Sequence, residues 1–362
     1  MTRPATLAAF LTASPIEALS KTAAKDALQT IREAASGREQ LKSLIASEGP
    51  ARDFTVAAVS LSPYLAEIVR IEPGLLDIAL FGDIESEIAS EIDAARTIWR
   101  TVGEESGSAE TALMNRLRLA KRKVAFLLAF ADLARYFRAP ETTRWLSRLA
   151  DACLASAVDF LLFSLHEQGK LRLPDPERPS ERSGLIVLGM GKLGAGELNY
   201  SSDIDVVVFF EPDRGIVTDP DEASETFARL CRRLVRIMQE RTAYGYVFRI
   251  DLRLRPDPGS TPLAIPVEAA LIYYEGRGQN WERAAFIKAR PVAGDIPAGE
   301  GFLKELTPFI FRKTMRQLPI STRSSARSTC TRASTRSPSR ATTSSSAAAA
   351  SARSSSSRRP SS

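Results

Sequence analysis

The sequence predicts an α+β protein in which a helical N-terminal region precedes a domain with a mixed β-sheet and flanking helices. Three observations carry this prediction. Apolar residues recur three and four apart through most of the first 170 residues, which is the period of a helix. Short apolar runs bounded by glycine, which are typical of strands, begin only near residue 184. After about residue 313 the composition changes to Ser and Arg, which predicts a disordered C-terminal tail.

We therefore divide the 362 residues into three parts. A helical region with a linker spans 1–180, a second domain spans 181–313, and the tail spans 314–362. The first boundary follows a proline-rich stretch, 171–179, which is typical of a linker. The strongest helical patterns before it cover 17–34, 61–71, 84–102, 111–137 and 144–167.

Composition and charge exclude several classes of protein. No stretch approaches the roughly 18 apolar residues that a membrane span needs, and the N-terminus lacks the apolar run of a signal peptide. The net charge of +6 belongs to the tail, because eleven Lys and Arg residues and no acidic residue follow Glu305. Residues 1–305 therefore carry 38 basic and 43 acidic residues, a net charge of −5. We expect neither a membrane nor a nucleic acid as a partner.

The cysteines and the single histidine narrow the chemistry further. Cys153, Cys231 and Cys330 lie far apart, so they predict neither a disulfide framework nor a zinc site. His166 is the only histidine, which excludes a metal site made of histidines and disfavours a histidine-centred catalytic triad. We expect a cytoplasmic protein in a reducing compartment.

The tail holds 17 serines between residues 315 and 362 without apolar periodicity. Three origins are open: a Ser/Arg arm that binds nucleic acid, a flexible linker, or a reading-frame shift in a GC-rich gene. The first would show regular repeats, and the second is rarely this rich in Arg. We favour the frame shift, which implies that the chain is truncated after about residue 313.

Residues 184–210 carry the first chemical signal. A buried strand is predicted over 184–189, and a glycine-rich turn leads from it to a second strand over 203–210. Gly189, Gly191 and Gly194 have the spacing of the dinucleotide fingerprint. That fingerprint needs a full crossover helix, but only nine residues separate Gly194 from Asp203, so we disfavour the dinucleotide interpretation.

Two carboxylates begin the second strand. Because side chains alternate along a strand, Asp203 and Asp205 share one face while Ile204 points into the core. Neighbouring like charges repel unless a hard cation lies between them, so the pair predicts a magnesium site. The alternative is a solvated strand end without function.

A third carboxylate lies beyond a predicted helix over 221–242. The stretch 246–256 alternates cleanly and predicts a strand. Asp251 shares its outer face with Arg249, Arg253 and Arg255. Such a face is suited to a metal and to phosphate oxygens, which arginine can bind in bidentate pairs.

These motifs resemble a known superfamily, the polymerase-β-type nucleotidyltransferases. Within it, the segments GMGKLGAGELNYSSDID (189–205), FRIDLRLRPD (248–257) and GQNWERAAFIKARPVAGD (278–295) are similar to one family, the bifunctional glutamine synthetase adenylyltransferase/adenylyl-removing enzymes. The form of the first segment and of Trp281-Glu282-Arg283 resembles the N-terminal, adenylyl-removing half. The resemblance covers about residues 15–313.

The resemblance implies a polymerase-β-like domain and a reaction. Inorganic phosphate would attack the AMP phosphorus on an adenylylated tyrosine of glutamine synthetase, releasing ADP and free tyrosine. Asp203, Asp205 and Asp251 would be the catalytic residues and would hold two Mg²⁺ ions. ATP, ADP and phosphate are the implied small molecules, and a PII-type regulatory protein is a further partner that the family allows.

Other residues receive supporting roles from the resemblance. The residues that would bind the nucleotide and phosphate are Gly191, Lys192, Gly194, Ser202, Arg253 and Arg255. Weaker candidates are Arg283, Lys288 and Arg290, whose segment, predicted helical, could equally be a solvated face. We expect Trp281 to pack in the core rather than to stack on adenine. The alternative function is a truncated, inactive fragment that at most binds glutamine synthetase.

Overall fold

The structure is a computed structural model that describes residues 3–103 and 108–311. Residues Met1–Lys313 form one compact unit. This unit is α+β with a mixed sheet, so the predicted fold class is confirmed. The tail 314–362, with its predicted disorder and its predicted frame shift, lies outside the described residues. The division of the unit into domains at residue 180 stays a prediction.

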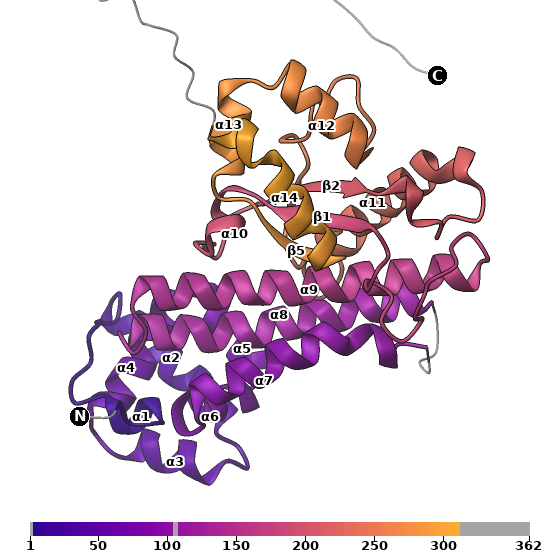
Figure 1. Cartoon of the computed structure of the whole chain (residues 1–362). Coiled ribbons are helices and arrows are strands. Elements are labelled where there is room, and N and C mark those ends of the chain that lie inside the picture. Colours follow the sequence, from indigo (N-terminus) through magenta and orange to yellow (C-terminus); the bar gives the residue numbers. More distant parts are fainter. Residues whose placement is uncertain (1–2, 104–107, 312–362) are drawn as a thin grey trace, which may run out of the picture. The chain divides into compact units, whose positions relative to one another are not determined.

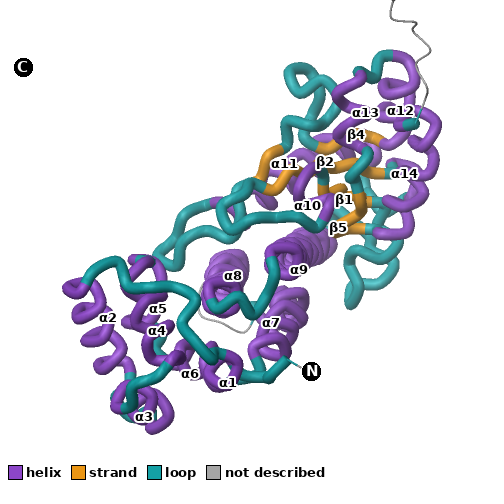
Figure 2. Tube along the Cα trace, turned by 90° about the vertical axis from the view of Figure 1, so that its left-hand side faces the viewer, coloured by secondary structure: helices purple, strands orange, loops and turns teal. Residues whose placement is uncertain are grey.

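Helices fill the N-terminal part of the unit (Figures 1 and 2). The five predicted helices correspond to α2, α5, α7 with a 3₁₀ turn, α8 and α9. The prediction missed the short helices α1, α3, α4 and α6. In order the helices are α1 Leu7–Phe10, α2 Lys21–Ala34, α3 Glu39–Ala46, α4 Pro50–Leu61, α5 Pro63–Ile71, α6 Gly74–Phe81, α7 Ile84–Thr97, η1 Ile98–Thr101, α8 Ala109–Leu133 and α9 Ala139–Glu167.

Helix α9 corrects one expectation from the sequence. By length and composition it could cross a bilayer, although we expected no such stretch. Within the described residues it is the one helix of this kind, and α4 with α5, bent by 108°, would add a second only if the pair were one span. Most of that apolar stretch is buried, because α9 packs against α7, α8, α11 and β5. It is therefore placed as a core helix.

The remaining elements build a five-stranded sheet. They are β1 Leu185–Gly189, α10 Gly191–Ala195, β2 Ile204–Phe210, η2 Pro212–Arg214, η3 Pro220–Glu222, α11 Ala223–Gln239, β3 Ile250–Asp251, β4 Ala264–Pro266, α12 Val267–Gly276, α13 Asn280–Phe286, β5 Arg290–Gly294 and α14 Ile296–Ile310. The strand order is β3-β2-β1-β5, and β4 also pairs with β2. β1 is antiparallel to β2 and β5, whereas β3 and β4 run parallel to β2.

Each face of the sheet is covered by its own helices. In β1, Leu185 and Val187 belong to the larger core, which includes residues of α8, α9 and α11. Ile186 and Leu188 belong to a second core with residues of α12 and α14. This alternation is what a strand buried on both faces requires. Figure 1 shows α9 running along one side of the strands and α14 along the other. The sheet thus forms the middle layer of three.

The predicted strand over 246–256 is wrong in its length. Only Ile250 and Asp251 form β3, and the chain turns directly afterwards. The turn begins because the Asp251 carboxylate accepts a hydrogen bond from the backbone N–H of Arg253 at 2.8 Å, which is an Asx-type turn. Pro256 and Pro258 follow and favour an irregular path. The apolar and polar residues of 246–256 do alternate in the sequence, but most of this segment is not a strand in the structure.

One buried arginine ties the helices to this segment. Arg118 of α8 is fully buried and donates hydrogen bonds to four carbonyls. One acceptor is Met114 on its own helix, two are Ile237 and Glu240 at the end of α11, and one is Gly245 in the following turn. From the sequence we expect Arg118 on the solvated basic face of the predicted helix over 111–137, and this expectation is wrong, because Arg118 is buried and fixes the turn that leads to β3.

Replacing Arg118 with Met should therefore destabilise the protein. The variant removes the side-chain donor of the Ile237 and Glu240 carbonyls, whereas Gly245 keeps the Thr242 N–H, so we expect a loss of about 3 kcal/mol in the free energy of unfolding. Arg70→Met is the matched control, because the exposed Arg70–Glu67 pair at 3.3 Å should contribute about 1 kcal/mol at most. Denaturant titration followed by circular dichroism measures both. Equal effects of the two variants would contradict the assigned role of Arg118.

Candidate active site

The glycine-rich turn connects two antiparallel strands. β1 pairs with β2 from Leu185↔Phe210 to Gly189↔Val206, and the Met190 N–H continues the ladder by donating to the Asp205 carbonyl at 2.9 Å. A dinucleotide fold joins parallel strands through a full helix, but here the five-residue α10 returns the chain directly. The rejection of the dinucleotide interpretation is confirmed.

Two of the three predicted carboxylates lie on neighbouring strands. Asp205 of β2 and Asp251 of β3 are direct partners in the parallel register, next to Ile204 and Ile250. The α10 turn closes over the same spot, because a Cβ added to Gly191 would lie 2.8 Å from Asp205 Oδ2. Gly191 also has a φ of +51°, which favours glycine. Asp205, Asp251 and Gly191 are therefore brought together.

The outer carboxylates are held by arginines. Asp203, just before β2, pairs with Arg249 Nε at 2.5 Å, and Arg249 also donates to the Ser201 carbonyl at 2.8 Å. Asp251 pairs with Arg253 Nη2 at 2.5 Å. In the ranges that the structure describes, no three acidic, His or Cys side chains are grouped closely enough to enclose an ion. Asp203 and Asp251 are each paired with an arginine instead.

The proton affinities reflect this arrangement. Burial, together with the negative charges of Asp251 and Asp203, raises the pKa of Asp205. The hydrogen bonds from Arg253 lower the pKa of Asp251. The surroundings of Asp205 thus disfavour its charged form. The donor set is made only of carboxylate oxygens, which are the ligands that Mg²⁺ prefers, so the residues fit the implied ion in kind.

The loop before β2 positions a lysine. Lys192 Nζ contacts Ser202 Oγ at 3.4 Å, and the same hydroxyl accepts a hydrogen bond from the Asn199 N–H at 3.3 Å. Helix α9 supports this loop, because Ser147 Oγ accepts from the Leu198 N–H at 3.1 Å. Lys192 and Ser202 therefore lie together beside the turn, as the sequence analysis grouped them.

Gly194 and Arg255 have clear folding roles. A Cβ on Gly194 would collide with the backbone carbonyl of Lys288, so the glycine lets the turn pack against the segment before β5. Arg255 donates to the carbonyls of Leu252 at 2.9 Å and Pro258 at 2.7 Å, and so closes the loop after β3. Its guanidinium is engaged with the backbone because the chain turns after Asp251 instead of continuing as a strand. This engagement argues against the predicted phosphate contact of Arg255.

The three weaker candidates lie on different elements, so their predicted single helical segment is wrong. Arg283 is on α13 and contacts Asn280 Oδ1 at 3.2 Å. Lys288 lies in the turn before β5 and pairs with Glu197 at 2.9 Å. Arg290 begins β5 and donates to the carbonyls of Leu193 and Gly194, at the end of α10. Trp281 on α13 is 51% exposed, so the expected core packing is also wrong.

Asp151 on α9 is a residue that the sequence analysis missed. Its carboxylate pairs with Arg290 at 2.9 Å, so helix α9 holds the arginine that supports the glycine turn. An aspartate within an apolar stretch of a long helix indicates a buried partner, because aspartate is rarely buried unpaired. That indication was available in the sequence. Burial raises the pKa of Asp151 to about 6 and outweighs the opposing effect of Arg290.

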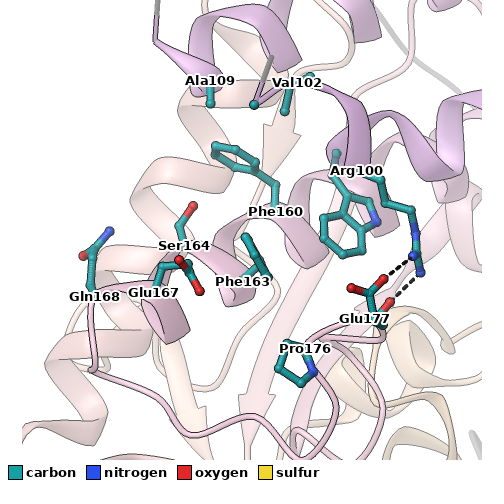
Figure 3. A pocket seen from close by; sticks show the side chains of 12 residues that line it. Arg100, Val102, Ala109, Phe160, Phe163, Ser164, Glu167, Gln168, Pro176 and Glu177 are labelled. Atoms are coloured by element: carbon teal, nitrogen blue, oxygen red, sulfur yellow. Dashed lines mark hydrogen bonds and ion pairs between the residues drawn. The ribbon is translucent and has the colours of Figure 1, made fainter. Parts of the chain in front are cut away.

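A separate cavity of about 450 Å³ lies at the end of α9 (Figure 3). Its walls include the rings of Trp99, Phe160 and Phe163, and Arg100 pairs with Glu177 at its rim, at 3.0 Å. None of the candidate site residues lines it. We therefore assign it no part in the chemistry at Asp205.

Comparisons with known proteins agree with this geometry. The family profile of glutamate–ammonia ligase adenylyltransferases matches residues 54–305, and this ligase is glutamine synthetase. Three similar relatives carry the name bifunctional glutamine synthetase adenylyltransferase/adenylyl-removing enzyme. That of Agrobacterium fabrum is 60% identical over 298 residues, 82% of this chain and 30% of the relative. That of Rhizobium meliloti is 59% identical over 300 residues, with the same shares. That of Mesorhizobium japonicum is 56% identical over 286 residues, 78% of this chain and 29% of the relative.

The matching family profile covers residues 54–305, more than half of the chain, and therefore defines the class of protein. The chain belongs to the glutamate–ammonia ligase adenylyltransferase family. It spans about three tenths of the length of the curated relatives it matches.

The raised pKa of Asp151 predicts a specific pH dependence. The folded protein keeps a proton on Asp151 up to about pH 6, whereas the ordinary value is 3.8, so the unfolded chain releases this proton first. The contribution of Asp151 to stability is therefore complete below pH 3.8 and is lost as the pH rises through 6. In Asp151→Asn the neutral side chain still offers an oxygen to Arg290. Between pH 4 and pH 7, the free energy of unfolding of the wild type should fall by up to about 2 kcal/mol relative to that of the variant. Urea titrations of both proteins at each pH measure the difference, and a constant difference would refute the assignment.

Proposed function

We propose that this chain removes AMP from an adenylylated tyrosine of glutamine synthetase by phosphorolysis. A phosphate oxygen attacks the AMP phosphorus, the bond from phosphorus to the tyrosine oxygen breaks, and ADP and the tyrosine hydroxyl are formed. The observation that carries the proposal is the position of Asp205 beside Asp251 under the Gly191 turn. The resemblance of residues 189–205 to the adenylyl-removing half favours this direction over transfer from ATP.

Each residue of the site has a proposed task. Asp203, Asp205 and Asp251 would hold two Mg²⁺ ions, which supply charge that orients the attacking oxygen and stabilises the leaving phenolate. Lys192, positioned by Ser202, would bind a phosphate oxygen together with the first amides of α10, which have no partner within the helix. Arg253 would offset negative charge once it leaves Asp251. We propose no phosphate contact for Arg255.

The proposed partners follow from the same reaction. Glutamine synthetase is the protein substrate, and phosphate, ADP and ATP are the small molecules of the site. We propose a cytoplasmic reaction and a PII-type regulatory protein as a further partner of this chain. A second candidate is a chain that binds glutamine synthetase without turnover. The arginines that occupy Asp203 and Asp251 favour it, because they compete with a metal ion.

The direction of the reaction gives the first test. Purified full chain with magnesium, phosphate and adenylylated glutamine synthetase should release ADP, measured by chromatography. The same chain with ATP and unmodified glutamine synthetase should transfer no AMP. Transfer from ATP without phosphorolysis would show that the opposite direction is correct, and binding without either reaction would support the second candidate.

The carboxylates give the second test. Asp203→Asn and Asp251→Asn should each lower turnover at least about a hundredfold, since each removes a charge that stabilises the transition state. Turnover should also stop in EDTA and return with magnesium or manganese. Thermal unfolding of both variants should stay close to that of the wild type, because Asp203 is half exposed and asparagine at 251 keeps an oxygen that accepts the Arg253 N–H. Full activity in EDTA would rule out the metal.

Two glycines give a matched third test. Gly191 and Gly196 have φ values of +51° and +72°, so alanine at either position should cost about 1 kcal/mol of stability. Only at Gly191 would the added Cβ meet Asp205, while Gly196 has open space around it. Gly191→Ala should therefore abolish turnover, and Gly196→Ala should keep most of it. Equal turnover of the two variants would show that the Gly191 contact with Asp205 is unimportant.

A further inference from the structure

Two neighbouring cavities, of about 420 and 530 Å³, share Tyr64 and Lys121 in their walls. The smaller one is closed by Tyr200, and the larger one by the turn between α11 and β3. We define the basic–aromatic groove by six of their lining residues: Tyr64, Lys121, Tyr200, Arg241, Tyr244 and Tyr246. None of them belongs to the carboxylate site described above.

The groove adjoins the catalytic carboxylates through direct contacts. Tyr200 lies three residues before Asp203 in the same loop. On the other wall, Arg249 Nη1 donates to the Tyr246 hydroxyl at 3.2 Å, and the same arginine pairs with Asp203. Lys121 lies over the Tyr246 ring at 5.5 Å. A continuous line of side chains therefore runs from Asp203 into the groove.

The groove carries uncompensated positive charge. Lys121 and Arg241 have no carboxylate partner in residues 3–103 and 108–311, and Arg122 beside them reaches Glu72 only at 3.7 Å. Two acidic residues also line the cavities. Glu67 pairs with Arg70 at 3.3 Å, whereas Asp132 accepts a hydrogen bond only from the neutral Thr142 hydroxyl, at 3.3 Å, and keeps its charge. Among the described residues that line the two cavities, Lys121 and Arg241 therefore outweigh the single unpaired carboxylate.

The aromatic side chains are unusually open to solvent. Tyr64, Tyr200 and Tyr244 are 47%, 39% and 42% exposed. Tyrosine and arginine are enriched at the centres of protein interfaces, where rings give contact area at little cost in side-chain entropy. The turn that presents Tyr244 and Tyr246 is held by the buried Arg118, so the groove is formed before any ligand arrives.

We propose that the basic–aromatic groove binds an acidic segment of the protein substrate next to the modified tyrosine. This rests on the proposed function, because a tyrosine that reaches Asp203 within a protein must bring its flanking residues across the adjoining surface. The groove is that surface, and its free cations select carboxylates. Its two neighbouring cavities suit an extended segment of chain, whereas we assign the nucleotide phosphates to Lys192 and the glycine turn.

A binding experiment tests the groove without requiring turnover. The probes are two short fluorescent peptides with a central tyrosine, flanked by glutamates in one and by glutamines in the other. Fluorescence anisotropy with the full chain at low salt should show at least about tenfold tighter binding of the glutamate peptide, weakening as salt is added. Lys121→Glu and Arg241→Glu should each weaken its binding about tenfold. Lys25→Glu, an exposed lysine on α2 outside the groove, is the control and should change nothing.

A further variant and a further probe extend the binding experiment. Lys121 is half-buried, so Lys121→Gln, with its fold checked by circular dichroism, repeats the test without a buried negative charge. Equal binding of the two peptides, or unchanged binding by the Lys121 and Arg241 variants, would overturn the proposal. An oligothymidylate that binds more tightly than the glutamate peptide and loses binding in the same variants would assign the groove to single-stranded nucleic acid instead.

Turnover separates this proposal from the proposed function. The groove variants should lower kcat/KM for adenylylated glutamine synthetase about tenfold more than for adenylyl-tyrosine amide, which has no flanking residues. If neither substrate turns over while the peptide results hold, the proposed function fails and the groove stands. If both substrates turn over and the variants affect them equally, the groove does not bind the protein substrate.

Discussion

The parallel pairing of two residues of β2 with two residues of β3 holds Asp205 beside Asp251, and the rest of the site depends on it. Like charges at this spacing repel, so the arrangement exists only because the strands around it are fixed independently. β2 is fixed by five register pairs with β1, and its hydrophobic residues are buried on both faces. Among the described residues, β3 is paired only with β2, and only through two residues. Contacts outside the sheet must therefore fix its position.

That position comes from the helices. Arg118 of α8 holds the end of α11 and the turn that follows, so the chain enters β3 from a fixed point. On the opposite side, Asp151 of α9 holds Arg290, which supports the end of α10 and therefore the turn over Asp205. Two charged residues on two long helices thus set the two walls of one site. These contacts add to the larger hydrophobic core, which joins the helical region and one face of the sheet in one compact unit.

The sequence predicted what depends on local pattern and on motif. The α+β class, the long helices and the strands β1 and β2 follow from periodicity within single segments. The length of β3 did not follow, because an Asx turn at Asp251 ended a segment whose alternation was clean. Arg290 and Arg118 were similarly beyond reach, since their roles depend on carbonyls distant in sequence, and Arg255 reaches its nearby carbonyls only because the chain turns after Asp251. From sequence alone, a basic residue near a motif cannot be told apart from a phosphate ligand, because its hydrogen-bond acceptors are not known.

The same reasoning bears on the competition between the arginines and a metal ion. Arg249 and Arg253 are 51% and 84% exposed in their pairs with Asp203 and Asp251, and exposed ion pairs contribute little to stability. Asp205, by contrast, is partly buried with no arginine of its own in the described chain and faces two like charges. An ion at Asp205 would relieve that repulsion while displacing only weakly held arginines. Arg249, once displaced, still contacts Tyr246 at the edge of the basic–aromatic groove. The carboxylate site and the groove are therefore connected through one side chain.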